Sequence, residues 1–361
     1  MNAAGFAACV SDFEPLARAK ISAMAYEYAA GGAADEITLR DNREAFDRLR
    51  LLPRILVDVS KIDTSVEIFG QRLEAPILLA PVAYHKIFHS EGETATAQGA
   101  GKAGVNMVLS SFSNTSVEEV AAHATTPLWF QLYVQSDRGF TRELVQRAEA
   151  AGCRALCVTV DTPVAGCRNR EERSGFCLPE GLDCPNLFGL KSGTPTTGHR
   201  PRGGGIYSAL FDAKLSWKDV EWIRSFAKAP VLLKGVLNPD DAEKAVAAGV
   251  AGIIVSNHGA RNLDTVPATL DVLPAIVDRV AGKVEVLMDG GIRRGTDILK
   301  ALALGAKAVL VGRPYIYGLA TSGAEGVARV VEILRAELEI AMALTGRTSV
   351  KELDKSMFYE K

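Results

Sequence analysis

The sequence lacks several features that would place a protein in a membrane, on nucleic acid or in an oxidising compartment. No apolar run is long enough to cross a bilayer, and the N-terminus has no basic segment followed by an apolar one, as a secretory signal has. The net charge of −2 gives no bias toward nucleic acid or an acidic membrane surface. The six cysteines form no C-x-x-C pair and have no metal-ligand spacing. We therefore expect a cytoplasmic protein with reduced thiols that binds no nucleic acid, membrane or metal.

What the sequence has instead is a regular alternation of strand and helix patterns. Short apolar runs typical of buried strands occur eight times, at 76–80, 106–110, 128–133, 155–160, 231–234, 252–256, 284–289 and 308–311. Alanine-rich amphipathic segments typical of helices lie between most of them, for example at 91–103, 117–124, 141–151, 240–248 and 295–304. Eight strand-then-helix units predict a (β/α)8 barrel, also called a TIM barrel. An open, doubly wound sheet is the alternative, which is less favoured because no G-x-G-x-x-G follows the first strand.

Several of the helical segments end in a glycine just before the next strand. These glycines are Gly104, Gly152, Gly249 and Gly305. Glycine at a helix C-terminus adopts the left-handed conformation that other residues resist. The recurrence supports repeated helix-to-strand joints, as a barrel requires.

We expect the whole chain, 1–361, to form one domain. Residues 1–75 predict an N-terminal extension of helices with a short hairpin at 65–73 that covers the bottom of the barrel. The barrel itself then occupies 76–320, and C-terminal helices occupy 321–361.

One connection breaks the rhythm of the barrel. The chain between Val160 and Val231 is far longer than one crossover needs, and only 217–227 is clearly helical. We assign 169–215 to a long loop after the fourth strand. Such a loop is either an active-site lid or an insertion without chemistry, and we favour the lid.

Polar residues are dense at the carboxyl ends of the eight strands, where a barrel builds its active site. Gly290-Gly291 and Arg293 follow the seventh strand, and Gly312-Arg313 follows the eighth. Each segment alone could be a glycine turn with a surface arginine. Both together, after the two strands where barrels commonly bind phosphate, predict a phosphate site.

A lysine, a histidine and an arginine also follow apolar strands. Lys234 needs an electron-rich partner, which could be a Schiff-base carbonyl or an anionic cofactor atom such as that of a reduced flavin. His258 can accept a proton near neutral pH, and Asp161 at another strand end can fix its tautomer. Arg261 can bind a carboxylate through two parallel hydrogen bonds. These residues predict an enzyme that deprotonates a small acid while holding its carboxylate.

The motifs that carry these residues resemble those of the FMN-dependent L-2-hydroxy acid oxidase/dehydrogenase family, which includes glycolate oxidase and lactate oxidase. They are Ser-Asn-His-Gly-Ala-Arg-Asn-Leu-Asp at 256–264, Asp-Gly-Gly-Ile-Arg-Arg-Gly-Thr-Asp at 289–297 and Gly-Arg-Pro at 312–314. Further matches include Met-Ala-Tyr-Glu-Tyr at 24–28 and Val-Asp-Thr-Pro at 160–163. The resemblance covers nearly the whole chain.

The resemblance implies a role for each candidate residue. His258 is implied to be the catalytic base, with Asp161 as its partner. The implied ligands of the substrate are Tyr26, Phe112, Tyr133, Arg168, His258 and Arg261. Of these, Arg168, Arg261 and Tyr26 hold the carboxylate, and Tyr133 also takes part in catalysis. The residues implied to bind FMN are Pro81, Val82, Ala83, Ser110, Gln131, Thr159, Lys234, Ser256, Asp289, Gly290, Gly291, Arg293, Gly312 and Arg313.

The implied reaction is oxidation of an (S)-2-hydroxy acid to the 2-oxo acid, with hydride transfer to flavin N5 and release of H2O2 after reaction with O2. A carbanion route would use the same residues. Phe112 and Ala165 stand where plant glycolate oxidases have tryptophan and leucine, so we expect lactate or a larger aliphatic or aromatic substrate. In the family that this chain resembles, members with alanine at the position of Ala83 tend to be oxidases, and those with glycine tend to be dehydrogenases. The resemblance therefore implies O2 as the acceptor. A dehydrogenase using quinone or cytochrome, a lactate monooxygenase and a flavin-binding barrel without turnover are the alternatives. A homotetramer is implied by resemblance alone.

Overall fold

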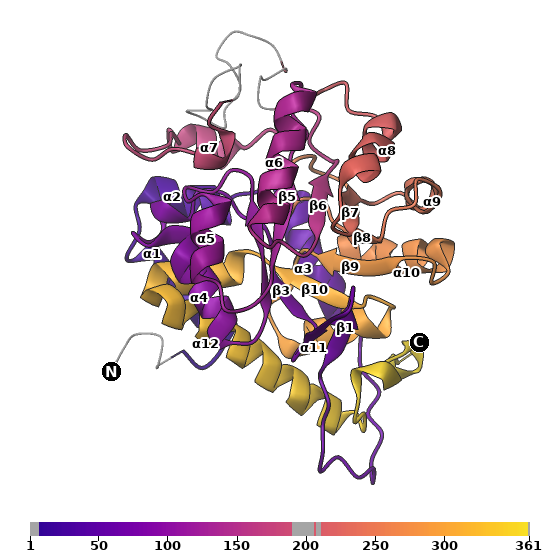
Figure 1. Ribbon diagram of the computed structural model, residues 1–361. Coiled ribbons are helices and arrows are strands. Elements are labelled where there is room, and N and C mark those ends of the chain that lie inside the picture. Colours follow the sequence, from indigo (N-terminus) through magenta and orange to yellow (C-terminus); the bar gives the residue numbers. More distant parts are fainter. Residues whose placement is uncertain (1–6, 190–205, 207–210, 360–361) are drawn as a thin grey trace.

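The computed structural model describes residues 7–189, 206 and 211–359, and its centre is a closed barrel of parallel strands (Figure 1). The strands are β3 (Ile77–Leu79), β4 (Asn106–Ser110), β5 (Leu128–Leu132), β6 (Leu156–Thr159), β7 (Val231–Val236), β8 (Gly252–Val255), β9 (Glu285–Asp289) and β10 (Ala308–Val311). β10 pairs with β3 through Val309 and Ile77, which closes the ring. This closure confirms the predicted (β/α)8 barrel and excludes the open, doubly wound sheet.

Helices surround the barrel on the outside (Figure 1). Those that follow barrel strands are α4 (Gly92–Lys102), α5 (Val117–His123), α6 (Arg138–Ala150), α8 (Trp217–Phe226), α9 (Pro239–Ala247), α10 (Thr269–Val280), α11 (Gly295–Ala303) and α12 (Arg313–Leu344). Before the barrel lie α1 (Phe13–Arg18), α2 (Ala23–Ala30) and α3 (Ile37–Arg48). α12 contains two helical segments, because Ser322 and Gly323 at its kink have non-helical backbone angles.

The glycines at the helix-to-strand joints have the conformation expected of them. Their φ angles are positive, at 68° for Gly104, 92° for Gly152, 69° for Gly249 and 104° for Gly305. An L-residue adopts such angles only with strain, so glycine lets each helix end and turn directly into the next strand.

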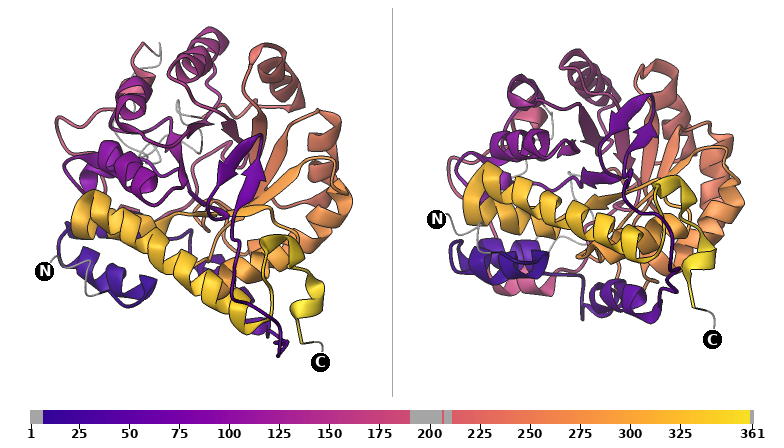
Figure 2. Two further views of the ribbon diagram at one scale, coloured as in Figure 1. Left: turned by 60° about the horizontal axis from the view of Figure 1, so that its bottom comes forward. Right: turned by 90° about the horizontal axis from the view of Figure 1, so that it is seen from below.

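A hairpin closes the barrel from below (Figure 2). The side chains inside the barrel form an apolar cluster separate from the rest of the core. The hairpin pairs β1 (Val66–Ile68) with β2 (Gln71–Leu73). Ile68 and Leu73 are buried in one cluster with inward-facing strand residues such as Leu78 and Trp129. The side chain of Gln71 accepts hydrogen bonds from Asn106 and Trp129, which satisfies two polar groups at this end of the barrel.

The long connection between β6 and β7 is described only in part. It contains α7 (Asn169–Arg173) and the short 3-10 turn η4 (Pro185–Leu187) before α8. Much of the segment that we predicted to be a lid lies outside the described residues. Within the described ranges, every helix is too short or too polar to traverse a bilayer.

Candidate active site

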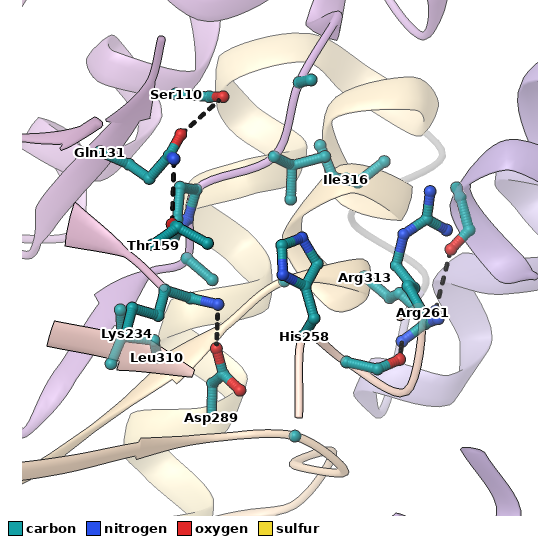
Figure 3. Close-up of a pocket in the computed structure, with 18 of the residues that line it drawn as sticks. Ser110, Gln131, Thr159, Lys234, His258, Arg261, Asp289, Leu310, Arg313 and Ile316 are labelled. Atoms are coloured by element: carbon teal, nitrogen blue, oxygen red, sulfur yellow. Dashed lines mark hydrogen bonds and ion pairs between the residues drawn. The ribbon is translucent and has the colours of Figure 1, made fainter. Parts of the chain in front are cut away.

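A cavity at the carboxyl ends of the barrel strands brings together most of the residues predicted for the site (Figure 3). The predicted residues that line it are Pro81, Val82, Ala83, Ser110, Phe112, Gln131, Tyr133, Thr159, Arg168, Lys234, His258, Arg261, Asp289, Gly290, Gly291, Arg293, Gly312 and Arg313. Asp161 and Ser256 lie behind this lining, where they contact His258 and Lys234. Tyr26 lies elsewhere.

His258 and Asp161 form a close pair beside the cavity. The Nδ1 atom of His258 lies 2.8 Å from Oδ1 of Asp161, and Nε2 lies 3.3 Å from the hydroxyl of Tyr133. A carboxylate facing Nδ1 places the proton there and leaves the lone pair on Nε2. Burial lowers the pKa of His258, and the charge of Asp161 offsets only part of that effect. The ring is therefore neutral near pH 7 and can accept a proton.

The space for Asp161 depends on a glycine in the neighbouring strand. Gly235 has a φ of 108°, and a Cβ added to it would lie 2.4 Å from Cγ of Asp161. The register between β7 and β8 shifts at this point, between Lys234 and Val236. At this bulge the backbone of Gly235, which has no side chain, faces Asp161. The carboxylate of Asp161 therefore has room beside His258.

Arg168 and Arg261 lie together on the cavity wall. Arg261 donates hydrogen bonds to the carbonyl oxygens of Tyr28 and Gly31, at 2.6 and 3.1 Å. Its guanidinium also lies over the ring of Tyr28, 4.8 Å from the ring centroid. The Nε atom of Arg168 donates to the carbonyl oxygen of Arg261 at 3.2 Å. Two cations on one wall can bind a carboxylate.

The structure corrects the assignment of Tyr26 to this wall. The hydroxyl of Tyr26 donates to Glu14 at 2.9 Å, and Tyr26 does not line the cavity, whereas Tyr28 does. Residues two apart on a helix point in nearly opposite directions, so only one of the two tyrosines of α2 can face the cavity. Tyr28 therefore takes the place expected for Tyr26.

A row of hydrogen-bonding side chains and a buried cation lie along the opposite wall (Figure 3). Ser110 donates to Gln131 at 3.1 Å, and Gln131 donates to Thr159 at 3.0 Å. Lys234 forms an ion pair with Asp289 at 3.0 Å. Burial acts to lower the pKa of Lys234, but the Asp289 and Asp161 carboxylates outweigh it and raise this pKa, so the lysine is charged.

The far end of the cavity is strongly cationic. Burial, with the positive charge of neighbouring arginines, lowers the pKa of Arg293 to about 10 and that of Arg313 to about 9. Neither guanidinium makes an ion pair with a carboxylate among the described residues. Gly290 and Gly291, both at positive φ, form the turn beside them. This end therefore favours a bound anion such as a phosphate.

Comparison with known proteins agrees with this geometry. The sequence model of the FMN-dependent dehydrogenase family matches residues 17–360. The chain belongs to this family. It is 49% identical over 355 residues to L-lactate oxidase of Nostoc sp., covering 96% of this chain and 97% of that protein. It is 46% identical over 350 residues to glycolate oxidase 1 of Oryza sativa subsp. indica, covering 97% and 95%. A crystal structure of mandelate oxidase with benzoyl-formic acid superposes with a TM-score of 0.88 at 41% identity, covering 98% of both chains.

The cofactor of this family is FMN, and the cavity residues fit it. The cationic end matches a phosphate, and the row from Ser110 to Thr159 can hydrogen-bond a heterocyclic ring edge. The Oδ1 atom of Asp289 is buried and has no hydrogen-bond partner among the described residues, so it can accept from a ribityl hydroxyl. Lys234 would place a positive charge beside the ring.

Three residues of the site were missed in the sequence. Tyr28 stood in the same motif as Tyr26, but the motif could not fix the phase of the helix. Glu171 contacts both Arg168 and Arg261, and its spacing of three residues from Arg168 is one at which helical ion pairs form. Gly235 inside a strand pattern is a known signal of a bulge or a close backbone approach.

Proposed function

We propose that the protein is an FMN-dependent (S)-2-hydroxy acid oxidase that forms a 2-oxo acid and H2O2. The observation that carries this proposal is the His258–Asp161 pair beside a cavity that His258, Arg168 and Arg261 line together. Bound FMN supplies the chemistry of taking two electrons from the substrate and passing them to O2. A protein that only bound a flavin would need neither a base nor a pair of carboxylate-binding arginines beside it.

The roles of the polar residues follow from their places. Arg168, Arg261 and Tyr28 hold the substrate carboxylate and so fix the orientation of its α-carbon. The Nε2 atom of His258 accepts the hydroxyl proton, and Asp161 stabilises the imidazolium that forms. Burial raises the pKa of Tyr133 far above neutral, so its hydroxyl keeps its proton and donates a hydrogen bond to the substrate oxygen. A route that begins with the α-proton would use the same groups.

The side-chain pocket supports a substrate larger than glycolate. Its aromatic walls include Phe112, whose ring centroid lies 4.9 Å from that of Tyr133, 6.1 Å from that of Phe211 and 6.5 Å from that of Tyr84. Ala165 contributes only a methyl group to the lining. We therefore propose lactate or a larger aliphatic or aromatic 2-hydroxy acid. The names of the relatives, which include lactate, glycolate and mandelate oxidases, support this range.

The proposed electron acceptor is O2. The relatives described above carry the name oxidase, and Ala83 lines the cavity at the position that favoured O2 in the sequence. The alternatives are a dehydrogenase that uses a quinone or cytochrome and a monooxygenase that couples peroxide to the 2-oxo acid. The cytoplasmic location and the homotetramer stay predictions from the sequence.

The test is oxygen uptake by the purified yellow protein with L-lactate, glycolate, 2-hydroxyoctanoate and L-mandelate. Oxygen uptake with one H2O2 formed per oxidised acid supports the oxidase. The acid oxidised fastest indicates the size of the side-chain pocket. Bleaching of the flavin without oxygen uptake would replace the oxidase by a dehydrogenase. Absence of bleaching with all 2-hydroxy acids would refute the proposed function.

A further inference from the structure

Glu171 is a buried carboxylate that touches both arginines of the substrate wall. Its Oε1 atom lies 2.6 Å from an amino nitrogen of Arg261, and its Oε2 atom lies 3.5 Å from an amino nitrogen of Arg168. The exposed fraction of the Glu171 side chain is 3%, compared with 17% for Arg168 and 14% for Arg261. A carboxylate this deeply buried is stable only with such partners.

We propose that Glu171 is a positioning residue that holds Arg168 and Arg261 in one fixed arrangement for the substrate carboxylate. This inference rests on the proposed function. We call the three residues the arginine clamp. Glu171 itself does not line the cavity, so it acts through the arginines and not by contact with the substrate.

The hydrogen bonds of Arg261 show how the clamp fixes a guanidinium. One amino nitrogen donates to the carbonyl oxygens of Tyr28 and Gly31, and the other donates to Glu171. A guanidinium is a planar group with five N–H donors, so acceptors on both amino nitrogens fix its plane and rotation. The remaining N–H donors of Arg261 therefore have a fixed direction before the substrate arrives. Little conformational freedom of the guanidinium is then lost when the substrate binds.

The charges of the clamp also favour a single acid. Two guanidiniums and one carboxylate leave a net charge of +1, which one substrate carboxylate neutralises. Burial acts to lower the pKa of Arg168, but Glu171, together with Tyr28 and Tyr133, outweighs burial and the pKa is raised. Without Glu171 the two cations would face each other with no buried counter-charge, and they would move apart or recruit other anions.

The position of Glu171 in the chain supports a dedicated contact. It lies on α7, three residues after Arg168, on the connection that follows β6. The next residue, Glu172, has the same side chain but is exposed to solvent. The helix therefore offers a matched pair of glutamates, of which one is in the clamp and one is outside it.

The test compares Glu171→Gln with Glu172→Gln as holoenzymes with bound FMN. We expect Glu171→Gln to keep its FMN but to lose about 10- to 100-fold in kcat/KM for the best 2-hydroxy acid, as small displacements in a site can cost. It should also bind the 2-oxo acid product more weakly, as followed by the flavin spectrum. Glu172→Gln should behave like the wild type. Glu171→Asp, which keeps the charge, should recover part of the loss.

A double-mutant cycle separates positioning from general support of the fold. In an Arg168→Met background, loss of Glu171 should cost clearly less than in the wild type, because one of its partners is already gone. Equal costs in both backgrounds, or kinetics of Glu171→Gln within about twofold of wild type, would overturn the inference. If Glu171→Gln does not fold, Glu171→Asp takes its place in the cycle, and equal costs of Glu171→Asp in the wild-type and Arg168→Met backgrounds would overturn the inference instead. Wild-type protein that oxidises no 2-hydroxy acid would refute the proposed function and not the clamp alone.

Discussion

His258 combines two properties that a base needs at neutral pH. Burial keeps its imidazole uncharged, and the Asp161 carboxylate 2.8 Å away stabilises the ring once it is protonated. Its backbone is also unusual, since His258, Gly259 and Ala260 have φ angles of 59°, 62° and 62°. Such consecutive left-handed residues form a tight turn that directs the side chain from the end of β8 toward the cavity.

Replacement of His258 by glutamine should abolish reduction of the flavin by substrate while FMN stays bound. Glutamine keeps a polar side chain of similar size but cannot accept the proton. Anaerobic mixing with the best 2-hydroxy acid, followed by absorbance, measures the rate, and we expect a loss of at least about 100-fold. Substantial remaining reduction would show that another group is the base.

Replacement of Asp161 by asparagine should change the pH profile as well as the rate. The wild-type kcat/KM should fall at low pH, with an apparent pKa below 6.5, as His258 becomes protonated. Because the Asp161 charge raises the pKa of His258, its removal lowers that pKa further and moves the acid limb to lower pH. The plateau should also drop, since the imidazolium loses its partner. An acid limb that stays in place or moves to higher pH would contradict the pairing.

The bulge in β7 is where a backbone element controls this chemistry. Gly235→Ala would place a Cβ 2.4 Å from Cγ of Asp161, so the carboxylate must move away from His258. We expect an activity loss similar to that of Asp161→Asn with FMN still bound. Gly152→Ala is the control, because Gly152 also has a positive φ but its Cβ would meet nothing within 4 Å. If both variants lose activity equally, backbone strain and not the contact with Asp161 is the cause.

Helices and strands with a regular pattern of apolar residues could be predicted from the sequence. Features that depend on contacts between helices and strands could not. The strands and most helices follow from apolar runs and from glycines such as Gly104 and Gly305, which are local signals. Tyr26 and Tyr28 show the limit, because both fit the motif and only the packing of α2 decides which faces the cavity. Glu171 was missed for the same reason, since its burial between two arginines is a property of the assembled site.

At the scale of the whole molecule, the cationic end of the cavity couples stability to the cofactor. Removal of FMN leaves Arg293 and Arg313 buried without a counter-ion, and the lowered pKa of each reflects this cost. We expect the apoprotein to melt several degrees lower, since saturation with a ligand at about 100 times its Kd adds about 3 kcal/mol. Riboflavin differs from FMN only by the phosphate, so thermal unfolding with each ligand measures how much the phosphate contributes to stability. Equal stabilisation by both would show that the phosphate contributes nothing.

The closure of the barrel by β3 and β10 also has a consequence for how the protein is made. Ile77 pairs with Val309, so almost the entire chain must leave the ribosome before the ring can form. The turns at the cationic end follow β9 and β10, whereas Pro81 follows β3. One part of the FMN site is therefore synthesised early and the other part late. A nascent chain therefore cannot capture the cofactor. FMN loading belongs to the last step of folding, and until the ring closes the growing chain exposes open, aggregation-prone strand edges.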